Sequence, residues 1–278
     1  MNVLLYLTLL HAWAGLALAQ PVEPEEVPLV QVRMISECDQ ITPGQPWLVG
    51  IHFTLKPQWH IYWKNPGQAG LATEIDYQVP AGVSVRPLEF PAPKSFDQGG
   101  GVIGYGYEDT VLLLAEIQVD PQAAVTGEFI LKASAYWLAC KDRCVLGEQQ
   151  VQLTIELAEE AHATAEKNLL HTWQKQLPKA LQGQHQLNVH STQRQLNPEL
   201  LEHQLEMAWS QAPGTLEVFP YLGHQDMVLD QIQTTHKDQT SRVDLRLSIP
   251  KAGVPPKASA ELLLKSERLG AIIVPVTF

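Results

Sequence analysis

The feature that most constrains the fold is a succession of short segments, apolar or alternating apolar and polar, with turn residues between them. Between residues 30 and 157 these segments are VQVRMIS, WLVGIHFTL, HIYW, TEIDYQV, VSVRPLEF, TVLLLAEIQV, GEFILKASAYWLA and EQQVQLTIEL. Val, Ile, Tyr and Trp are frequent in them and Pro or Gly separates them, which is typical of β-strands. About eight strands in a span of this length predict an antiparallel β-sandwich.

The chain changes character after residue 157. The segment AEEAHATAEKNLLHTWQKQLPKAL, residues 158–181, is rich in Ala, Glu, Lys and Leu and has apolar residues at helical spacing. It predicts one connector helix whose apolar stripe packs on a sheet. After a Gln-rich loop, strand-like segments return as QLEMAWSQ, TLEVFPYL, MVLDQIQTT, SRVDLRLSIP, SAELLLKS and GAIIVPVTF. They predict a second, smaller β domain.

The fold expected from the sequence is therefore mainly β. A β-sandwich occupies residues 20–157, a connector helix and loop occupy 158–186, and the second β domain occupies 187–278. Residues 1–19 form an apolar segment that ends in Ala-Leu-Ala, a pattern typical of a signal peptide cleaved after Ala19. No Lys or Arg precedes the apolar block, so a retained membrane anchor is the alternative. After cleavage we expect an exported protein without stable membrane insertion.

Charge and motifs exclude several classes of function. The chain has 30 acidic and 19 basic residues, a net charge of -11, and no run of Lys or Arg, so we expect no nucleic-acid partner. The Gly-rich stretch SFDQGGGVIGYGY lacks the Gly-Lys-Ser/Thr of a phosphate-binding loop. The ten histidines form no HExxH motif, so zinc catalysis is unsupported. No cofactor is expected.

Two of the three cysteines lie close together in YWLACKDRCVLGE, where Lys141, Asp142 and Arg143 separate Cys140 from Cys144. Outside the cytosol such a pair is expected to be oxidised. If these three residues form the loop of a β-hairpin, Cys140 faces Cys144 at a separation that suits a disulfide.

The register of that hairpin can be tested on the residues themselves. One face pairs Ala139 with Val145, Ala133 with Val151, Leu131 with Leu153 and Phe129 with Ile155, and is apolar. The other face pairs Tyr136 with Glu148, Ser134 with Gln150, Lys132 with Gln152 and Ile130 with Thr154, and is mostly polar. Trp137 falls opposite Gly147, where its ring can cover the glycine backbone. Both cysteines are predicted to lie on the outward face.

Three roles remain open for this pair from the residues alone. As a structural disulfide it contributes little, because so short a loop is worth about 2 kcal/mol in the chain-entropy model against about 4.7 for a loop of 100 residues. As an exchange site it is exposed, and the charges of Lys141 and Arg143 favour the reactive thiolate. The third role is a metal site, in which Cu(I) binds Cys140, Cys144 and His60.

Three segments of the sequence resemble a known protein family. PQWHIYWKNPGQAG (residues 57–70), FPAPKSFDQGGGVIGYGYEDTVLLLAEI (residues 90–117) and YWLACKDRCVLGE are similar to the N-terminal periplasmic domain of the thiol:disulfide interchange protein DsbD, in its ScsB-like branch, which is associated with copper tolerance. The resemblance implies an immunoglobulin-like fold in the periplasm. It also implies protein thiol-disulfide oxidoreductase activity of the protein-disulfide reductase type, with Cys140 and Cys144 as the redox pair.

The same resemblance assigns roles to other residues. The Ser95 to Gly101 segment matches a cap loop over the cysteines, with Phe96 as the covering ring; a plain flexible connection is the alternative. Asp97 in this segment either tunes the acidity of the thiols or only solvates the loop. His60 and Tyr62 match ring-bearing positions beside the pair. Their alternative is the outward face of a strand whose other face carries Trp59, Ile61 and Trp63.

The chain departs from the family in two ways. The cysteine spacing is shorter than in DsbD itself, and we expect no transmembrane electron conduit of the kind that DsbD-type proteins carry. We therefore expect thioredoxin-like periplasmic proteins or a membrane thiol reductase as electron donor or acceptor. The alternative function is a copper-binding or protein-binding module with a structural disulfide. For Cys38 an unreactive thiol is expected, with a metal ligand, a resolving thiol or an intermolecular disulfide as alternatives.

Overall fold

A computed structural model describes residues 28–123, 127–180, 187–197, 199–222, 228–248 and 259–277 of the chain. The predicted signal peptide, residues 1–19, lies outside this part. Among the described residues, no helix combines the length and apolar character that crossing a membrane requires.

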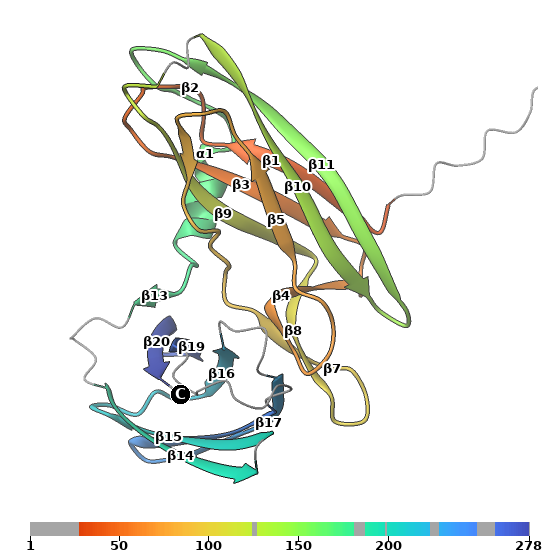
Figure 1. Cartoon of the computed structure of the whole chain (residues 1–278), viewed down its shortest axis with the longest axis vertical. Coiled ribbons are helices and arrows are strands. Elements are labelled where there is room, and N and C mark those ends of the chain that lie inside the picture. Colours follow the sequence, from red (N-terminus) through yellow and green to blue (C-terminus); the bar gives the residue numbers. More distant parts are fainter. Residues whose placement is uncertain are drawn as a thin grey trace, which may run out of the picture.

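The N-terminal sandwich consists of two sheets (Figure 1). The first contains, in spatial order, β1 (Val30–Ser36), β3 (Trp47–Leu55), β9 (Thr110–Val119) and β6 (Val83–Val85). The second contains β12 (His162–Ala163), β2 (Cys38–Ile41), β11 (Cys144–Leu157), β10 (Glu128–Cys140), β4 (His60–Gly67), β8 (Ile103–Glu108) and β7 (Lys94–Asp97), and β5 (Glu74–Gln78) also pairs with β10. The predicted mainly β, immunoglobulin-like fold is confirmed.

The central strand of the first sheet is buried on both faces. Residues Val111 to Ala115 of β9 are fully buried, which matches their uninterrupted apolar sequence. One face of β9 packs on the core shared with the second sheet. The other face packs on the single helix described, α1 (Lys167–Gln174), through Leu112, Leu114 and the buried Leu170.

The helix is shorter than the sequence analysis predicts. We expected one helix over residues 158–181, but α1 has eight residues, between the short strands β12 and β13 (Lys179–Ala180). The segment before α1 pairs with β2 through backbone hydrogen bonds, and Pro178 follows its end. The predicted packing of its apolar stripe on a sheet is confirmed by the cluster of Leu112, Leu114, Leu170 and Leu177.

The C-terminal sandwich, our name for the sheets after α1, also has two layers. One sheet contains β13, β20 (Gly270–Thr277), β19 (Ser259–Ser266) and β16 (Leu216–Tyr221), and the other contains β14 (Leu187–Asn197), β15 (Leu200–Trp209), β18 (Thr240–Ser248) and β17 (Val228–Lys237). Strand β14 lies within the predicted second β domain, but the sequence analysis did not predict it as a strand. This edge strand is mostly exposed, so its sequence lacks an apolar face.

A buried histidine makes the stability of the C-terminal sandwich pH-dependent. Burial lowers the pKa of His203, in the core between Leu201 and Leu205, from 6.5 to about 4. The unfolded chain takes up the proton first, so stability present above pH 6.5 is lost as the pH falls toward about 4. We expect urea unfolding to show a loss of about 2 kcal/mol between about pH 7 and pH 5, and a smaller loss in His203→Gln. A His190→Gln control should behave as the wild type; equal losses in the wild type and His203→Gln would contradict this prediction.

Candidate redox site

The hairpin that carries the cysteine pair has the predicted register. Strands β10 and β11 pair from Glu128 opposite Glu156 to Cys140 opposite Cys144. The two cysteines form a disulfide, with their Cα atoms 4.1 Å apart. Gln149, the polar residue opposite Ala135, donates a hydrogen bond to the carbonyl oxygen of Val32 at 2.8 Å, so its side chain is satisfied there.

The outward face of the hairpin is covered at Cys140, which corrects the expectation that both cysteines are exposed. Strand β4 pairs with the end of β10, with His60 opposite Cys140. The Tyr62 side chain, from the same strand, reaches the Cys140 sulfur, and Cys140 is only 3% exposed, whereas Cys144 is exposed. Leu146, on the same face two residues further, is 72% exposed. The disulfide thus has one sulfur-bearing residue inside the fold and one at its surface.

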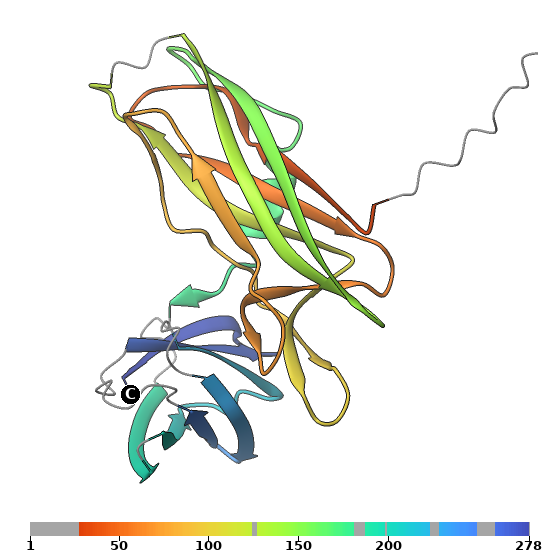
Figure 2. The same cartoon turned by 45° about the vertical axis from the view of Figure 1, so that its right-hand side comes forward.

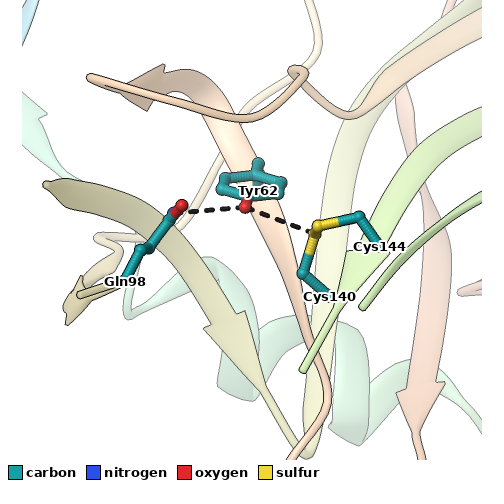
Figure 3. Close-up of a disulfide and its surroundings, with 4 residues drawn as sticks. All are labelled: Tyr62, Gln98, Cys140 and Cys144. Atoms are coloured by element: carbon teal, nitrogen blue, oxygen red, sulfur yellow. Dashed lines mark hydrogen bonds between the residues drawn. A yellow bond between two sulfur atoms is a disulfide. The ribbon is translucent and has the colours of Figure 1, made fainter. Parts of the chain in front are cut away.

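A tyrosine hydroxyl reaches the buried sulfur (Figure 3). Tyr62, on β4, donates a hydrogen bond to Sγ of Cys140 at 3.4 Å, and Nε2 of Gln98 donates to the Tyr62 oxygen at 3.1 Å. Because the Gln98 donor occupies one lone pair of that oxygen, the hydroxyl proton is directed toward the sulfur. Consecutive hydrogen bonds of this kind polarise one another. The arrangement can therefore stabilise negative charge on Cys140.

Burial keeps both rings beside the disulfide in their neutral forms. Burial raises the pKa of Tyr62 above 10.0, and the hydrogen bond from Gln98 opposes this only in part. Tyr62 therefore remains a donor at neutral pH. Burial lowers the pKa of His60 below 6.5, against the attraction of Glu108. His60 stacks on Phe96 with ring centroids 4.7 Å apart and meets Tyr62 edge-on at 5.3 Å.

The Tyr62 ring lies in a space bounded by glycines. A Cβ atom at Gly70 would lie 2.3 Å from the ring, and one at Gly104 would lie 3.3 Å from it and 2.0 Å from Nε2 of Gln98. At Gly106, opposite Tyr62 in the β4 and β8 register, a Cβ would lie 2.0 Å from the Ile61 carbonyl oxygen. The Gly-x-Gly of this segment thus allows β8 and the ring to approach closely.

The segment predicted to be a cap lies beside this tyrosine. Strands β7 and β8 and the turn between them, residues 94–108, form what we call the cap hairpin. Gly99, Gly100 and Gly101 in its turn have positive φ and open surroundings, as a tight glycine turn requires. Phe96 covers His60, while Tyr62 and Gln98 provide the hydrogen bonds that lead to the sulfur.

Among the described residues, the charged candidates form no side-chain hydrogen bond or ion pair with the cysteines. Asp97 accepts a hydrogen bond from the backbone N–H of Gly99 at 2.8 Å and so closes the turn of the cap hairpin. Lys141 and Arg143 are exposed in the hairpin loop, where the Lys141 N–H donates to the Arg143 carbonyl oxygen. Their effect on thiolate formation stays a prediction.

Cys38 is remote from the pair. Strand β2 pairs with β11 at Gln40 opposite Glu156, which places Cys38 about ten residues, or about 30 Å, from Cys144 along the strand. Cys38 is buried and free, and burial raises the pKa of its thiol. It can serve neither as a resolving thiol nor as a metal ligand with the pair.

The indole of Trp137 lies over Gly147, as predicted. A Cβ atom at Gly147 would lie 2.2 to 2.4 Å from three indole atoms, and Trp137 also meets Phe53 edge-on. Gly147→Ala should displace the ring and lower the free energy of unfolding by about 1–3 kcal/mol, measured by urea denaturation. In a Trp137→Phe background, whose ring is smaller, Gly147→Ala should lower the free energy of unfolding by less. If the single Gly147→Ala variant is as stable as the wild type, the Trp137 ring does not exclude a side chain at position 147.

The family model of the thiol:disulfide interchange protein DsbD, N-terminal, matches residues 27–156, which contain the whole hairpin and its covering strands. This part of the chain belongs to the DsbD N-terminal family. The resemblance seen in the sequence is thereby confirmed, and it implies a role in thiol-disulfide interchange.

Solved structures extend the likeness to the C-terminal sandwich. The N-terminal periplasmic domain of ScsB from Proteus mirabilis has a TM-score of 0.68 at 18% identity, covering 94% of this chain and 96% of that chain. Because the identity is low, this match shows a shared fold only, and that fold extends through both sandwiches. A protein of unknown function from Porphyromonas gingivalis W83 has a TM-score of 0.26 at 10% identity, covering 90% of this chain and 100% of that chain, and carries no argument. No curated protein matches the sequence.

Within this DsbD N-terminal domain, the sequence analysis missed Gln98, Gly70 and Gly104. Gln98 lies one residue after Asp97 in the cap segment, and nothing in its own sequence environment distinguishes it from a surface glutamine. The signal for the glycines was present, because Gly104 and Gly106 flank Tyr105 with the Gly-x-Gly spacing of a strand that another chain segment approaches closely.

Proposed function

We propose that this protein is an exported thiol-disulfide exchange protein that relays electrons through Cys140 and Cys144. The observation that carries the proposal is the asymmetric disulfide. Cys144 is exposed at the end of the hairpin, and Cys140 is buried against the Tyr62 hydroxyl. Membership of the first sandwich in the DsbD N-terminal family supports the same conclusion.

This asymmetry suits a defined order of steps. A partner thiolate attacks Sγ of Cys144, forms a mixed disulfide with it, and breaks its bond to Cys140. Cys140 leaves as a thiolate that accepts the Tyr62 hydrogen bond, and it then takes up a proton. A second thiolate of the partner attacks the partner's sulfur in the mixed disulfide and releases Cys144. The protein disulfide gains two electrons and two protons, and the partner dithiol becomes a disulfide.

The partners that fit this chemistry are thioredoxin-like periplasmic proteins or a membrane thiol reductase. Signal-peptide cleavage after Ala19 and periplasmic location remain part of this proposal, as do the domain limits at residues 157 and 187. To test it, the oxidised protein is mixed with a reduced thioredoxin-like protein, and thiols are counted by alkylation and mass. Transfer of two electrons to the Cys140 and Cys144 pair supports the proposal, whereas a disulfide that persists after equilibration opposes it.

Copper binding is the second candidate, favoured by one observation. His60 lies opposite Cys140, and its Nε2 is buried without a hydrogen-bond partner among the described residues. After reduction, Cys140, Cys144 and His60 offer two thiolates and an imidazole, ligands that suit Cu(I). Stoichiometric Cu(I) uptake by the reduced protein that is lost in a Cys140→Ser/Cys144→Ser double variant would favour this function.

A further inference from the structure

The C-terminal sandwich contacts the strands that lie beside the disulfide in its sheet. Strands β4, β8 and β7 lie between the hairpin end of the N-terminal sandwich and the C-terminal sandwich in both views (Figures 1 and 2). Phe219 of β16 meets Trp63 on β4 edge-on at 6.3 Å and Tyr105 on β8 edge-on at 5.1 Å. One aromatic ring of the C-terminal sandwich therefore supports both strands.

Polar contacts fix the same strands. Lys64 of β4 forms an ion pair with Glu261 at 3.2 Å and lies over the ring of Tyr221 at 4.0 Å. Asn65 donates a hydrogen bond to the carbonyl oxygen of Pro220. Lys64 and Asn65 follow Tyr62 by only two and three residues, so these contacts restrain the segment that presents the hydroxyl to Cys140.

Gln68 connects the C-terminal sandwich to the cap hairpin through a single side chain. Its Nε2 donates to the carbonyl oxygen of Asp230, on β17, at 2.6 Å. Its Oε1 accepts from the N–H of Ile103 at 2.8 Å, and its own N–H donates to the Ile103 carbonyl oxygen at 2.9 Å. Both polar atoms of the Gln68 side-chain amide therefore form hydrogen bonds, the nitrogen to the C-terminal sandwich and the oxygen to the cap hairpin.

The contact at Ile103 acts on the residue that orients Tyr62. Ile103 pairs with Asp97 in the cap hairpin, and Gln98 is the next residue after Asp97. The backbone N–H of Gln98 donates to the carbonyl oxygen of Val102, the residue directly before Ile103. The side chain of Gln98 donates to the hydroxyl oxygen of Tyr62. Hydrogen bonds joined by the Val102–Ile103 peptide group thus connect Asp230, through Gln68 and the cap hairpin, to the sulfur of Cys140.

We propose that Gln68 is a positioning residue through which the C-terminal sandwich holds the cap hairpin and directs the Tyr62 hydroxyl at Cys140. This assigns the C-terminal sandwich a role in tuning the reactivity of a disulfide it does not contain. Loss of the Asp230 contact lets the hairpin move and leaves Tyr62 less often in the orientation that stabilises the leaving thiolate. The role of Gln68 in electron transfer between proteins rests on the proposed exchange function.

The test measures the rate at which dithiothreitol reduces the Cys140 and Cys144 disulfide in the full chain. Gln68→Glu keeps the oxygen that accepts from Ile103 but removes the donor to Asp230, and Gln68→Met removes both. Gln118 is a matched control, because its Nε2 also donates to a backbone carbonyl at 2.6 Å, that of Gly44 in the N-terminal sandwich. We expect Gln68→Glu to slow reduction about two- to tenfold, as the loss of one hydrogen bond predicts, and Gln118→Glu to leave the rate unchanged.

A double-mutant cycle separates positioning from a general structural effect. If Gln68 acts through Tyr62, Gln68→Glu should not slow reduction further in a Tyr62→Phe background. An unchanged or faster rate in Gln68→Glu, a rate equal to that of Gln118→Glu, or independent effects of Gln68→Glu and Tyr62→Phe would overturn the proposal. Dithiothreitol needs no protein partner, so failure of exchange with thioredoxin-like proteins would refute the proposed function and leave this result standing.

Discussion

A Cys140→Ser variant is expected to form a persistent mixed disulfide through Cys144, whereas a Cys144→Ser variant should form one far more slowly. Cys144 is exposed, so its thiol is open to in-line attack on a partner disulfide, while Cys140, beside β4 and in contact with the Tyr62 hydroxyl, is 3% exposed. Accessibility and thiolate character govern cysteine reactivity, and we expect the two rates to differ by on the order of tenfold or more. The measurement is chromophore release from an aromatic disulfide reagent, followed by trapping with an oxidised thioredoxin-like protein.

The free cysteine provides the control for this experiment. Cys38 is buried about 30 Å from the pair, so Cys38→Ser in either background should not change the rates. Equal reactivity of the two single variants, or faster reaction of Cys144→Ser, would contradict the assignment of Cys144 as the attacked residue. It would also mean that the strand covering Cys140 opens readily in solution.

Replacing Tyr62 by Phe should slow reduction of the disulfide by roughly 10- to 100-fold. The substitution keeps the ring between Gly70 and Gly104 and removes only the hydroxyl that donates to Cys140. A hydrogen bond to a charged group is worth about 1.5–3 kcal/mol, and the leaving thiolate loses this stabilisation in the transition state. The rate constant for reduction by dithiothreitol measures the effect directly.

Tyr136 offers a matched control on the same hairpin. It is 39% exposed and has no side-chain hydrogen bond to the cysteines among the described contacts. Tyr136→Phe should therefore reduce at the wild-type rate. If Tyr62→Phe also reduces at that rate, the Tyr62 hydroxyl does not assist departure of Cys140. A faster rate would indicate that the hydrogen bond mainly stabilises the oxidised form.

The hairpin could be predicted residue by residue because its information is local. Alternation of apolar and polar residues around a three-residue loop sets the register, and a slip of one residue would expose the apolar face. Pairing from Phe129 opposite Ile155 to Cys140 opposite Cys144 follows from that pattern alone. The burial of Cys140 could not be derived in this way, because the residue that contacts its sulfur, Tyr62, lies on a strand 78 positions earlier.

Other differences have similar physical causes. Strand β14 was missed because an exposed edge strand needs no apolar face, and residues 187–197 are largely Gln, Asn, Ser and His. The connector was predicted as a long helix because Ala, Glu and Lys favour helices, yet backbone pairing of His162 and Ala163 with β2 prevails there. The positioning role proposed for Gln68 depends on three segments meeting, which no local pattern contains.

We propose that the Cys140 and Cys144 disulfide is an exchange site rather than a structural bond. The most direct test is its reduction potential, measured by equilibrating the full chain with dithiol buffers and quantifying the alkylated pair. We expect a potential above about -300 mV, in the range of disulfides that exchange with protein partners. A value well below about -300 mV would contradict it, because the pair would then remain oxidised against any thioredoxin-like reductant.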